Sequence, residues 1–163
     1  MNEHEIIDAL RSSSFFSELP DEQLHMLAEV AKQVEYPGNT VIFQEHEPAN
    51  EVFLVLSGKV ALVICLTGKG CRQIMEVGDG ELLGWSPLLH KHRLTDTART
   101  LTPVKALTFD SSQLLKLCEE NPSFGYEFMR RTAMVLSDRL YGVRCQLVDV
   151  YGTNLPEVVL ESD

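Results

Sequence analysis

The sequence has no long hydrophobic run. No apolar stretch approaches the ~18 residues that a membrane-spanning helix needs. The first residues, MNEHEIIDALRSSS, are acidic and have no apolar core of the kind that a signal peptide carries. These absences argue against a spanning helix and a secretory leader, so we expect a cytoplasmic protein without a membrane partner.

Cysteine is scarce and is not spaced for metal binding. The four cysteines are Cys65, Cys71, Cys118 and Cys145, and no two of them form a C-x-x-C pair or another metal-ligand spacing. In a cytoplasmic protein we expect reduced thiols that pack as small apolar residues in strands and helices. No metal centre is predicted.

Positive charge is also in short supply. The net charge is -10, from 14 Lys and Arg against 24 Asp and Glu. The largest basic clusters, Lys91 to Arg93 and the pair Arg130 and Arg131, are too small to form a phosphate-binding face. Direct binding to nucleic acid is therefore not expected.

The periodicity of apolar residues divides the chain into helix, strands and helix. With 163 residues the chain has the length of one domain, which we place at residues 1–150, with a loose acidic tail at 151–163. Apolar residues at helical spacing precede residue 32, and Phe15 and Phe16 between the helical segments are candidates for the core. Short alternating runs separated by glycine turns then fill residues 32–109, which predicts an antiparallel sandwich, barrel or jelly roll.

Two helices are predicted after the last strand. Asp110 or Ser111 can cap the first, and Asn121 followed by Pro122 is the start of a second that reaches about Val150. Along the second helix apolar residues recur at spacings of four and three, as in a coiled coil. We expect this apolar seam to form a homodimer contact, although it could instead pack back on the strands; its residues are Met129, Ala133, Leu136, Leu140, Val143, Leu147 and Val150.

Several glycines fall in the register of a known family. Pro37-Gly38-Asn39, the stretch from Glu45 to Gly58, and Gly78-Asp79-Gly80 with Gly84 resemble motifs of the cyclic nucleotide-binding domain. That family includes the effector domain of catabolite-activator-type regulators and the regulatory subunit of cAMP-dependent kinase. The resemblance covers about residues 10–148 and implies an α+β fold with an eight-stranded antiparallel jelly roll, N-terminal helices and two C-terminal helices. His46 stands where the pattern usually has glycine.

The nucleotide-binding cassette departs from the family at two positions. The family has a Glu after the last glycine, which accepts a hydrogen bond from the ribose, and here that position is Trp85. The family has an Arg that pairs with the cyclic phosphate, and here the matching triplet is Asp96-Thr97-Ala98. A carboxylate repels a phosphate, so the resemblance implies the fold more strongly than it implies the ligand. Trp85 could stack on a ligand ring or fill the space that a nucleotide would occupy.

The candidate site therefore keeps the cassette and adds one cation. Arg93 could reach the pocket and replace the missing arginine, whereas Arg99 alternates with Ala98 and should point to the opposite face. A metal held by His90, His92 and Asp96 is a minor alternative. The expected ligand-binding residues are Gly80, Leu83, Gly84, Trp85, Ser86, Arg93, Asp96, Thr97 and Ala98.

No residue pattern predicts an enzyme, because no nucleophile–base pair or phosphate-cradling loop is present. We expect a standalone regulatory module without a DNA-binding domain of its own, which does not bind cAMP or cGMP in the usual way and acts through an unknown protein partner. The alternative is a ligand-free interaction or dimerisation module that keeps the fold. Gly78, Gly80 and Gly84 favour the first hypothesis, unless turn geometry alone explains them; Trp85 and Asp96 favour the second.

Overall fold

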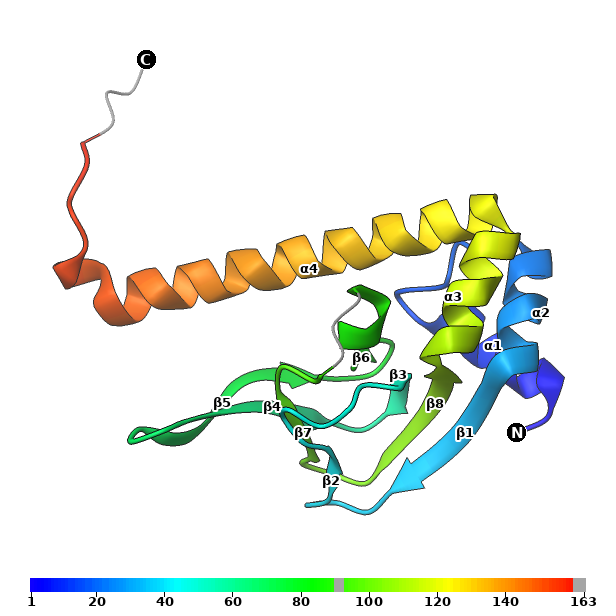
Figure 1. Ribbon diagram of the computed structural model, residues 1–163, viewed down its shortest axis with the longest axis horizontal. Coiled ribbons are helices and arrows are strands. Elements are labelled where there is room, and N and C mark those ends of the chain that lie inside the picture. The colour runs from blue at the N-terminus through cyan, green and yellow to red at the C-terminus, as the bar shows by residue number, and fades with distance from the viewer. Residues whose placement is uncertain (90–92, 160–163) are drawn as a thin grey trace. The chain divides into compact units, whose positions relative to one another are not determined.

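The computed structural model describes residues 1–89 and 93–159 (Figure 1). The chain divides into two compact units, one from Met1 to Gly125 and one that begins at Tyr126. The first unit holds the strands and the shorter helices. The second holds most of the long C-terminal helix.

Two helices open the first unit. Helix α1 (Glu3–Ser12) begins with a capping box, in which Asn2 accepts the Glu5 amide and Glu5 accepts the Asn2 amide. Helix α2 (Asp21–Val30) follows Pro20, a residue that suits the start of a helix. Each helix buries one apolar face, and the linker between them buries Phe15 and Phe16 as expected; the helical core residues are Ile6, Ile7, Leu10, Leu24, Leu27 and Ala28.

The described residues contain eight strands in two four-stranded antiparallel sheets. One sheet has the order β1-β8-β3-β6, and its strands are β1 (Ala31–Tyr36), β8 (Val104–Asp110), β3 (Glu51–Ser57) and β6 (Leu82–Leu83). The other has the order β2-β7-β4-β5, and its strands are β2 (Val41–Phe43), β7 (Thr97–Thr100), β4 (Val60–Leu66) and β5 (Gly70–Val77). This arrangement confirms the predicted jelly roll. Strand β6 has only two residues, too few for a visible alternation, and sequence periodicity did not identify it.

The core lies inside the roll, where inward-facing residues of both sheets meet. In β3, which lies between β8 and β6 in its sheet, Val52 to Val55 are all buried. One cluster of buried residues joins strands β2 to β8; its members are Phe43, Ala49, Phe53, Val55, Val60, Leu62, Val77, Leu83, Leu94, Ala98, Val104 and Ala106. The strands that carry the candidate site are therefore held by a packed interior.

Two α-helices follow the strands. Helix α3 (Ser111–Glu120) is capped by Asp110, whose Oδ1 accepts the Gln113 amide at 3.0 Å. Helix α4 (Pro122–Tyr151) starts at the predicted proline, and a short 3₁₀ turn, η2 (Gly152–Asn154), follows it. No helix in the described ranges is both long enough and apolar enough to cross a membrane.

Candidate functional site

The glycines that lead into the cassette have structural reasons of their own. Gly80 has φ +80, and a Cβ there would lie 3.0 Å from the Ser14 amide nitrogen. Gly84 has φ +76, and a Cβ there would lie 3.1 Å from the Glu51 carbonyl oxygen. Both positions thus combine a left-handed backbone with a close approach, which glycine alone tolerates easily. Gly80 and Gly84 are therefore needed with or without a ligand.

Glu81 closes the turn before β6. Its Oε2 accepts the amide hydrogen of Gly78 at 2.8 Å. This contact gives Glu81 a role in the turn.

After Gly84 the chain makes a compact turn. Leu83 is buried in β6 opposite Phe53. Trp85 is half-buried, and its carbonyl accepts the Leu88 amide at 2.9 Å at the start of the 3₁₀ helix η1 (Ser86–Leu89). Ser86 is buried. Trp85 thus lies between strand β6 and helix η1.

The triplet Asp96-Thr97-Ala98 leads into β7. Ala98 is fully buried and pairs with Leu62 of β4. Thr97 is half-buried, and its Oγ1 accepts the Glu45 amide at 3.0 Å. Asp96, which precedes the strand, is also half-buried. The triplet therefore has one side chain in the core and one tied to the β2–β3 loop.

The two candidate cations lie apart. The Arg93 guanidinium donates to the His46 carbonyl at 2.6 Å, and the backbone of this segment pairs with the β2–β3 loop. Arg99 is exposed and donates to Oδ1 of Asn39, while the neighbouring Ala98 side chain is buried. The expectation that Arg99 faces away from Ala98 is confirmed, and Arg93 keeps an exposed guanidinium beside the loop.

His46 takes the conformation of the glycine that it replaces. Its φ is 71°, in the left-handed region that a histidine seldom adopts. The β2–β3 loop therefore has the backbone that the sequence resemblance implies, with a side chain added. His90, Lys91 and His92 lie outside the described residues. Within the described residues, no group of three or more His, Cys, Asp or Glu side chains could hold a metal ion.

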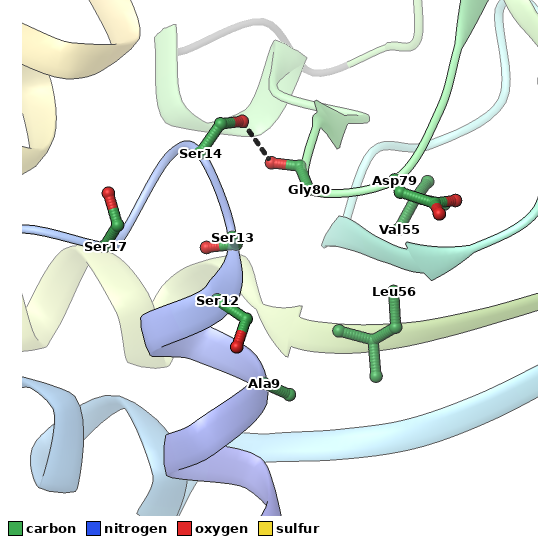
Figure 2. Close-up of a pocket in the computed structure, with 9 residues that line it drawn as sticks. All are labelled: Ala9, Ser12, Ser13, Ser14, Ser17, Val55, Leu56, Asp79 and Gly80. Atoms are coloured by element: carbon green, nitrogen blue, oxygen red, sulfur yellow. Dashed lines mark hydrogen bonds between the residues drawn. The ribbon is translucent and has the colours of Figure 1, made fainter.

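A serine-rich cavity of about 540 Å³ lies beside Gly80 (Figure 2). Ser14 Oγ donates to the Gly80 carbonyl at 3.0 Å. The cavity lies between the loop after α1 and the turn at Asp79 and Gly80. In the sequence, these serines indicate no more than a linker. Its lining includes Ser12, Ser13, Ser14, Ser17, Val55, Asp79 and Gly80.

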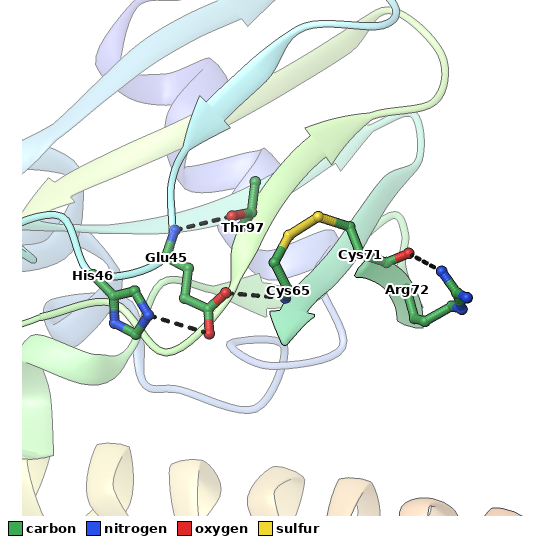
Figure 3. Close-up of a disulfide and its surroundings, with 6 residues drawn as sticks. All are labelled: Glu45, His46, Cys65, Cys71, Arg72 and Thr97. Atoms are coloured by element: carbon green, nitrogen blue, oxygen red, sulfur yellow. Dashed lines mark hydrogen bonds and ion pairs between the residues drawn. A yellow bond between two sulfur atoms is a disulfide. The ribbon is translucent and has the colours of Figure 1, made fainter. Parts of the chain in front are cut away.

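The expectation of four reduced, buried cysteines is wrong. Cys65 and Cys71 form a disulfide, and both are exposed (Figure 3). Cys145 is exposed and Cys118 half-buried. Burial raises the pKa of the Cys118 thiol to about 11, which keeps it protonated. The prediction failed because it looked for metal-ligand spacings, whereas a hairpin turn at residues 67–69 places Cys65 and Cys71 opposite each other.

The apolar seam on α4 is largely exposed. Leu140, Val143 and Leu147 are 59%, 44% and 48% exposed, Ala133 is exposed, and Met129 and Leu136 are half-buried. A second exposed stripe, at a spacing of seven, was not identified from the sequence; its residues are Met134, Tyr141 and Val148. Helix α4 therefore offers a wider apolar surface than the heptad pattern alone predicts.

A jelly roll with a glycine-framed cassette between β6 and β7 and a long C-terminal helix defines a class of regulatory ligand-binding domains. The sequence profile of the cyclic nucleotide-binding domain matches residues 33–121, more than half of the chain. The chain belongs to the cyclic nucleotide-binding domain family.

Individual relatives agree with this assignment. The chain is 22% identical to the CRP-like cAMP-activated global transcriptional regulator of Mycobacterium tuberculosis, over 91% of this chain and 65% of the regulator, so it spans less than two thirds of that relative. It is 27% identical to the N-terminal domain of a transcriptional regulator from Streptomyces coelicolor, with a TM-score of 0.67, over 80% of this chain and 94% of that one. At 16% identity it shares its fold with the regulatory subunit of a cAMP-independent protein kinase A from Trypanosoma cruzi bound to guanosine (TM-score 0.62, 83% of this chain and 51% of that one).

Proposed function

We propose that the chain is a regulatory domain that senses a small ligand at the cassette between Gly80 and Ala98, but does not hold cAMP or cGMP in the family's usual way. The observation that carries this proposal is the pair of Trp85 and Asp96 at the positions where the family pattern has its ribose-binding Glu and its phosphate-binding Arg. The described residues around them retain the family's backbone, including the left-handed Gly80, Gly84 and His46.

The charge of Asp96 decides against the usual phosphate contact. Loss of one partner from a buried charge pair typically costs about 2–5 kcal/mol, and each ~1.4 kcal/mol lowers affinity tenfold. A half-buried carboxylate adds repulsion of the phosphate to that loss. A site that would otherwise be micromolar is expected to become millimolar or weaker for a cyclic nucleotide.

An uncharged purine nucleoside suits these residues better. Trp85 is half-buried and supplies an aromatic face, and Asp96 can accept hydrogen bonds from a ribose hydroxyl without meeting a phosphate. The structure of the Trypanosoma cruzi kinase subunit with guanosine supports the idea that this fold can hold a nucleoside. Arg93 donates to the His46 carbonyl through Nη1 and has further N–H groups that can donate to a ligand.

Calorimetric titration tests the proposal. The purified protein is titrated with cAMP, cGMP, adenosine and guanosine at near-physiological salt. We expect no measurable cyclic nucleotide binding by the native protein, and a gain of cAMP affinity in Asp96→Arg. Glu29→Arg, an exposed site on α2 with the same change of charge, serves as the control and should gain nothing. Micromolar cAMP binding by the native protein would overturn the proposal.

A second candidate function is a ligand-free dimerisation or interaction module. The exposed apolar seam of α4 favours it, because soluble proteins seldom leave a contiguous apolar surface uncovered. In this case two copies of α4 would pair along Leu136, Leu140, Val143 and Leu147, and the cassette would have only a structural role.

Light scattering distinguishes the two oligomeric states. Leu140→Glu places a charge in the middle of the seam and should convert a dimer into a monomer. Ser137→Glu puts the same charge on an exposed position off the seam and should leave the dimer intact. A native protein that elutes as a monomer at all concentrations would exclude pairing through α4.

A further inference from the structure

The disulfide lies at the accessible tip of a hairpin whose base is buried. Strands β4 and β5 pair from Val60↔Val77 to Leu66↔Gly70, with Cys65 directly opposite Cys71. Val60, Leu62 and Val77 at the base are buried, whereas residues 65–73 are all exposed. A reductant can therefore reach the sulfur atoms while the core keeps the rest of the hairpin in place.

The short loop argues against a purely structural role. Cys65 and Cys71 are only six residues apart, and the strands on either side already pair without the bond. A disulfide that closes a small loop removes little entropy from the unfolded chain. Breaking this bond should therefore loosen the hairpin tip and leave the fold intact.

Glu45 connects the disulfide to the cassette (Figure 3). Its Oε2 accepts the Cys65 amide at 3.2 Å, and its own amide donates to Thr97 Oγ1 at 3.0 Å. The side chain of Glu45 is only 13% exposed, so its carboxylate depends on the hydrogen bond from the Cys65 amide. The neighbouring His46 lies 3.7 Å from Glu45 Oε1, and its carbonyl holds Arg93. A shift of the Cys65 backbone would thus be transmitted to two candidate site residues, Thr97 and Arg93.

We propose that Cys65 and Cys71 form a thiol–disulfide exchange site for a dithiol reductant, and that its redox state changes the packing of the Glu45 loop against residues 93–97. The oxidised form holds Cys65 and Glu45 in register with Thr97. The reduced form releases the hairpin tip and weakens those contacts. This inference is independent of which ligand the cassette takes, because its test needs no ligand.

Either sulfur can accept the attacking thiolate, because Cys65 and Cys71 are both exposed. The Arg72 guanidinium donates to the Cys71 carbonyl at 2.8 Å and the Glu45 carboxylate accepts the Cys65 amide, so both charged groups contact the backbone of the hairpin tip.

Reduction then proceeds in two steps. A thiolate of the dithiol bonds to the Sγ of one cysteine, the bond between the two cysteines breaks, and the other cysteine leaves and takes a proton. The second thiolate of the dithiol attacks its own partner sulfur in the mixed disulfide, so that the reductant becomes a disulfide and the first cysteine leaves and is protonated. Two electrons and two protons pass from the dithiol to the protein.

The first test is differential alkylation of the whole chain after equilibration in reduced or oxidised dithiothreitol, read by peptide mass spectrometry. Cys65 and Cys71 should be unlabelled in the oxidised buffer and labelled together in the reduced buffer, with unchanged far-ultraviolet circular dichroism. With glutathione, a monothiol, a mixed disulfide should be trapped on Cys65 or Cys71. Free thiols in the oxidised buffer, or unfolding on reduction, would overturn the proposal.

The second test is hydrogen exchange at three amides that the contacts protect, those of Cys65, Glu45 and His46. Reduction should speed their exchange by about tenfold, because a lost hydrogen bond lowers local protection. The double variant Cys65→Ser/Cys71→Ser should exchange fast in both buffers. Glu45→Ala should remove the redox response at position 46, whereas the control Glu29→Ala, at an exposed glutamate of α2, should keep it. If the exchange rates of the native protein were the same in both redox buffers, the disulfide would only stabilise the hairpin, and the proposal would be wrong.

Discussion

The jelly roll and helix α4 both contain regularly placed apolar residues, but the two regions differ in whether these residues are covered. In the roll, core residues such as Leu54 and Leu107 have no exposed surface. In α4, residues at heptad spacing such as Leu140 and Leu147 are about half exposed. Periodicity thus tells which side chains share a face, but the element opposite decides whether that face is a core or a surface open to a partner.

The largest expected loss of stability is in the jelly roll. Leu54→Ala removes a side chain that is fully buried and pairs with Leu107 across β3 and β8. The free energy of unfolding should fall by about 2–5 kcal/mol, because a cavity remains in a packed interior. Urea denaturation followed by the fluorescence of Trp85 measures this change. Leu140→Ala is the matched variant in α4, and a monomeric protein should lose no more than about 0.5 kcal/mol.

A smaller but clear loss is expected at the cassette approach. Gly84→Ala keeps the polarity but adds a Cβ at φ +76 and 3.1 Å from the Glu51 carbonyl. We expect a loss of about 1–3 kcal/mol from this strained backbone. Gly142→Ala in α4, where nothing lies within 4 Å of the added atom, should instead stabilise by about 1 kcal/mol. Equal effects at the two glycines would contradict the view that the fold itself requires Gly84.

The next effect tests the junction between strand and helix. Asp110 accepts the Gln113 amide at the start of α3, and hydrogen bonds from Ser112 and from that amide lower the pKa of its carboxyl. Asp110→Ala should cost about 1 kcal/mol, as for other N-caps. Asp110→Asn retains an acceptor and should recover most of the loss in a thermal melt. If the Asn variant were as unstable as the Ala variant, the cap would not be the cause.

The smallest effect concerns an ion-pair cluster near the start of α4. Glu127 accepts hydrogen bonds from Arg130 at 2.8 Å and Arg131 at 2.7 Å, which lower its pKa to about 2. A lowered pKa means that the contribution is complete above the ordinary Glu value of about 4.3 and is lost as the pH falls through 2. Solvent keeps that contribution small. Nuclear magnetic resonance titration of the Glu127 carboxyl should show the low midpoint, and Arg131→Gln should raise it toward the ordinary value.

Local signals in the sequence were sufficient for most of the fold. Proline at residues 20 and 122, the cap at Asp110 and the glycine turns each depend on near neighbours, and the helices and turns appear where these residues predict them. Strand β6 was not predicted because two leucines are too few to show an alternation, and because it pairs with β3, a segment almost thirty residues earlier in the chain. The family motifs supplied what periodicity could not, namely that the strands form an eight-stranded jelly roll.

The candidate site was only partly predictable. Trp85 and Asp96 could be identified as departures because each occupies a known position in a motif. The contacts that surround them could not, since Thr97 bonds to Glu45 and Arg93 to His46 across about fifty residues. The cysteines show the same limit. Six residues of spacing say nothing about a disulfide until the hairpin register is known.

The sequence by itself determined the fold class and the family, because these follow from local patterns and residue identity, and it predicts the loss of the two polar contacts on which cyclic nucleotide recognition depends. The tertiary structure alone decided three other matters: that Gly80 and Gly84 serve the backbone, that Cys65 meets Cys71, and that the α4 seam is exposed. Each of these depends on which atoms come within a few ångströms of one another in the folded chain, and no local pattern records such distances.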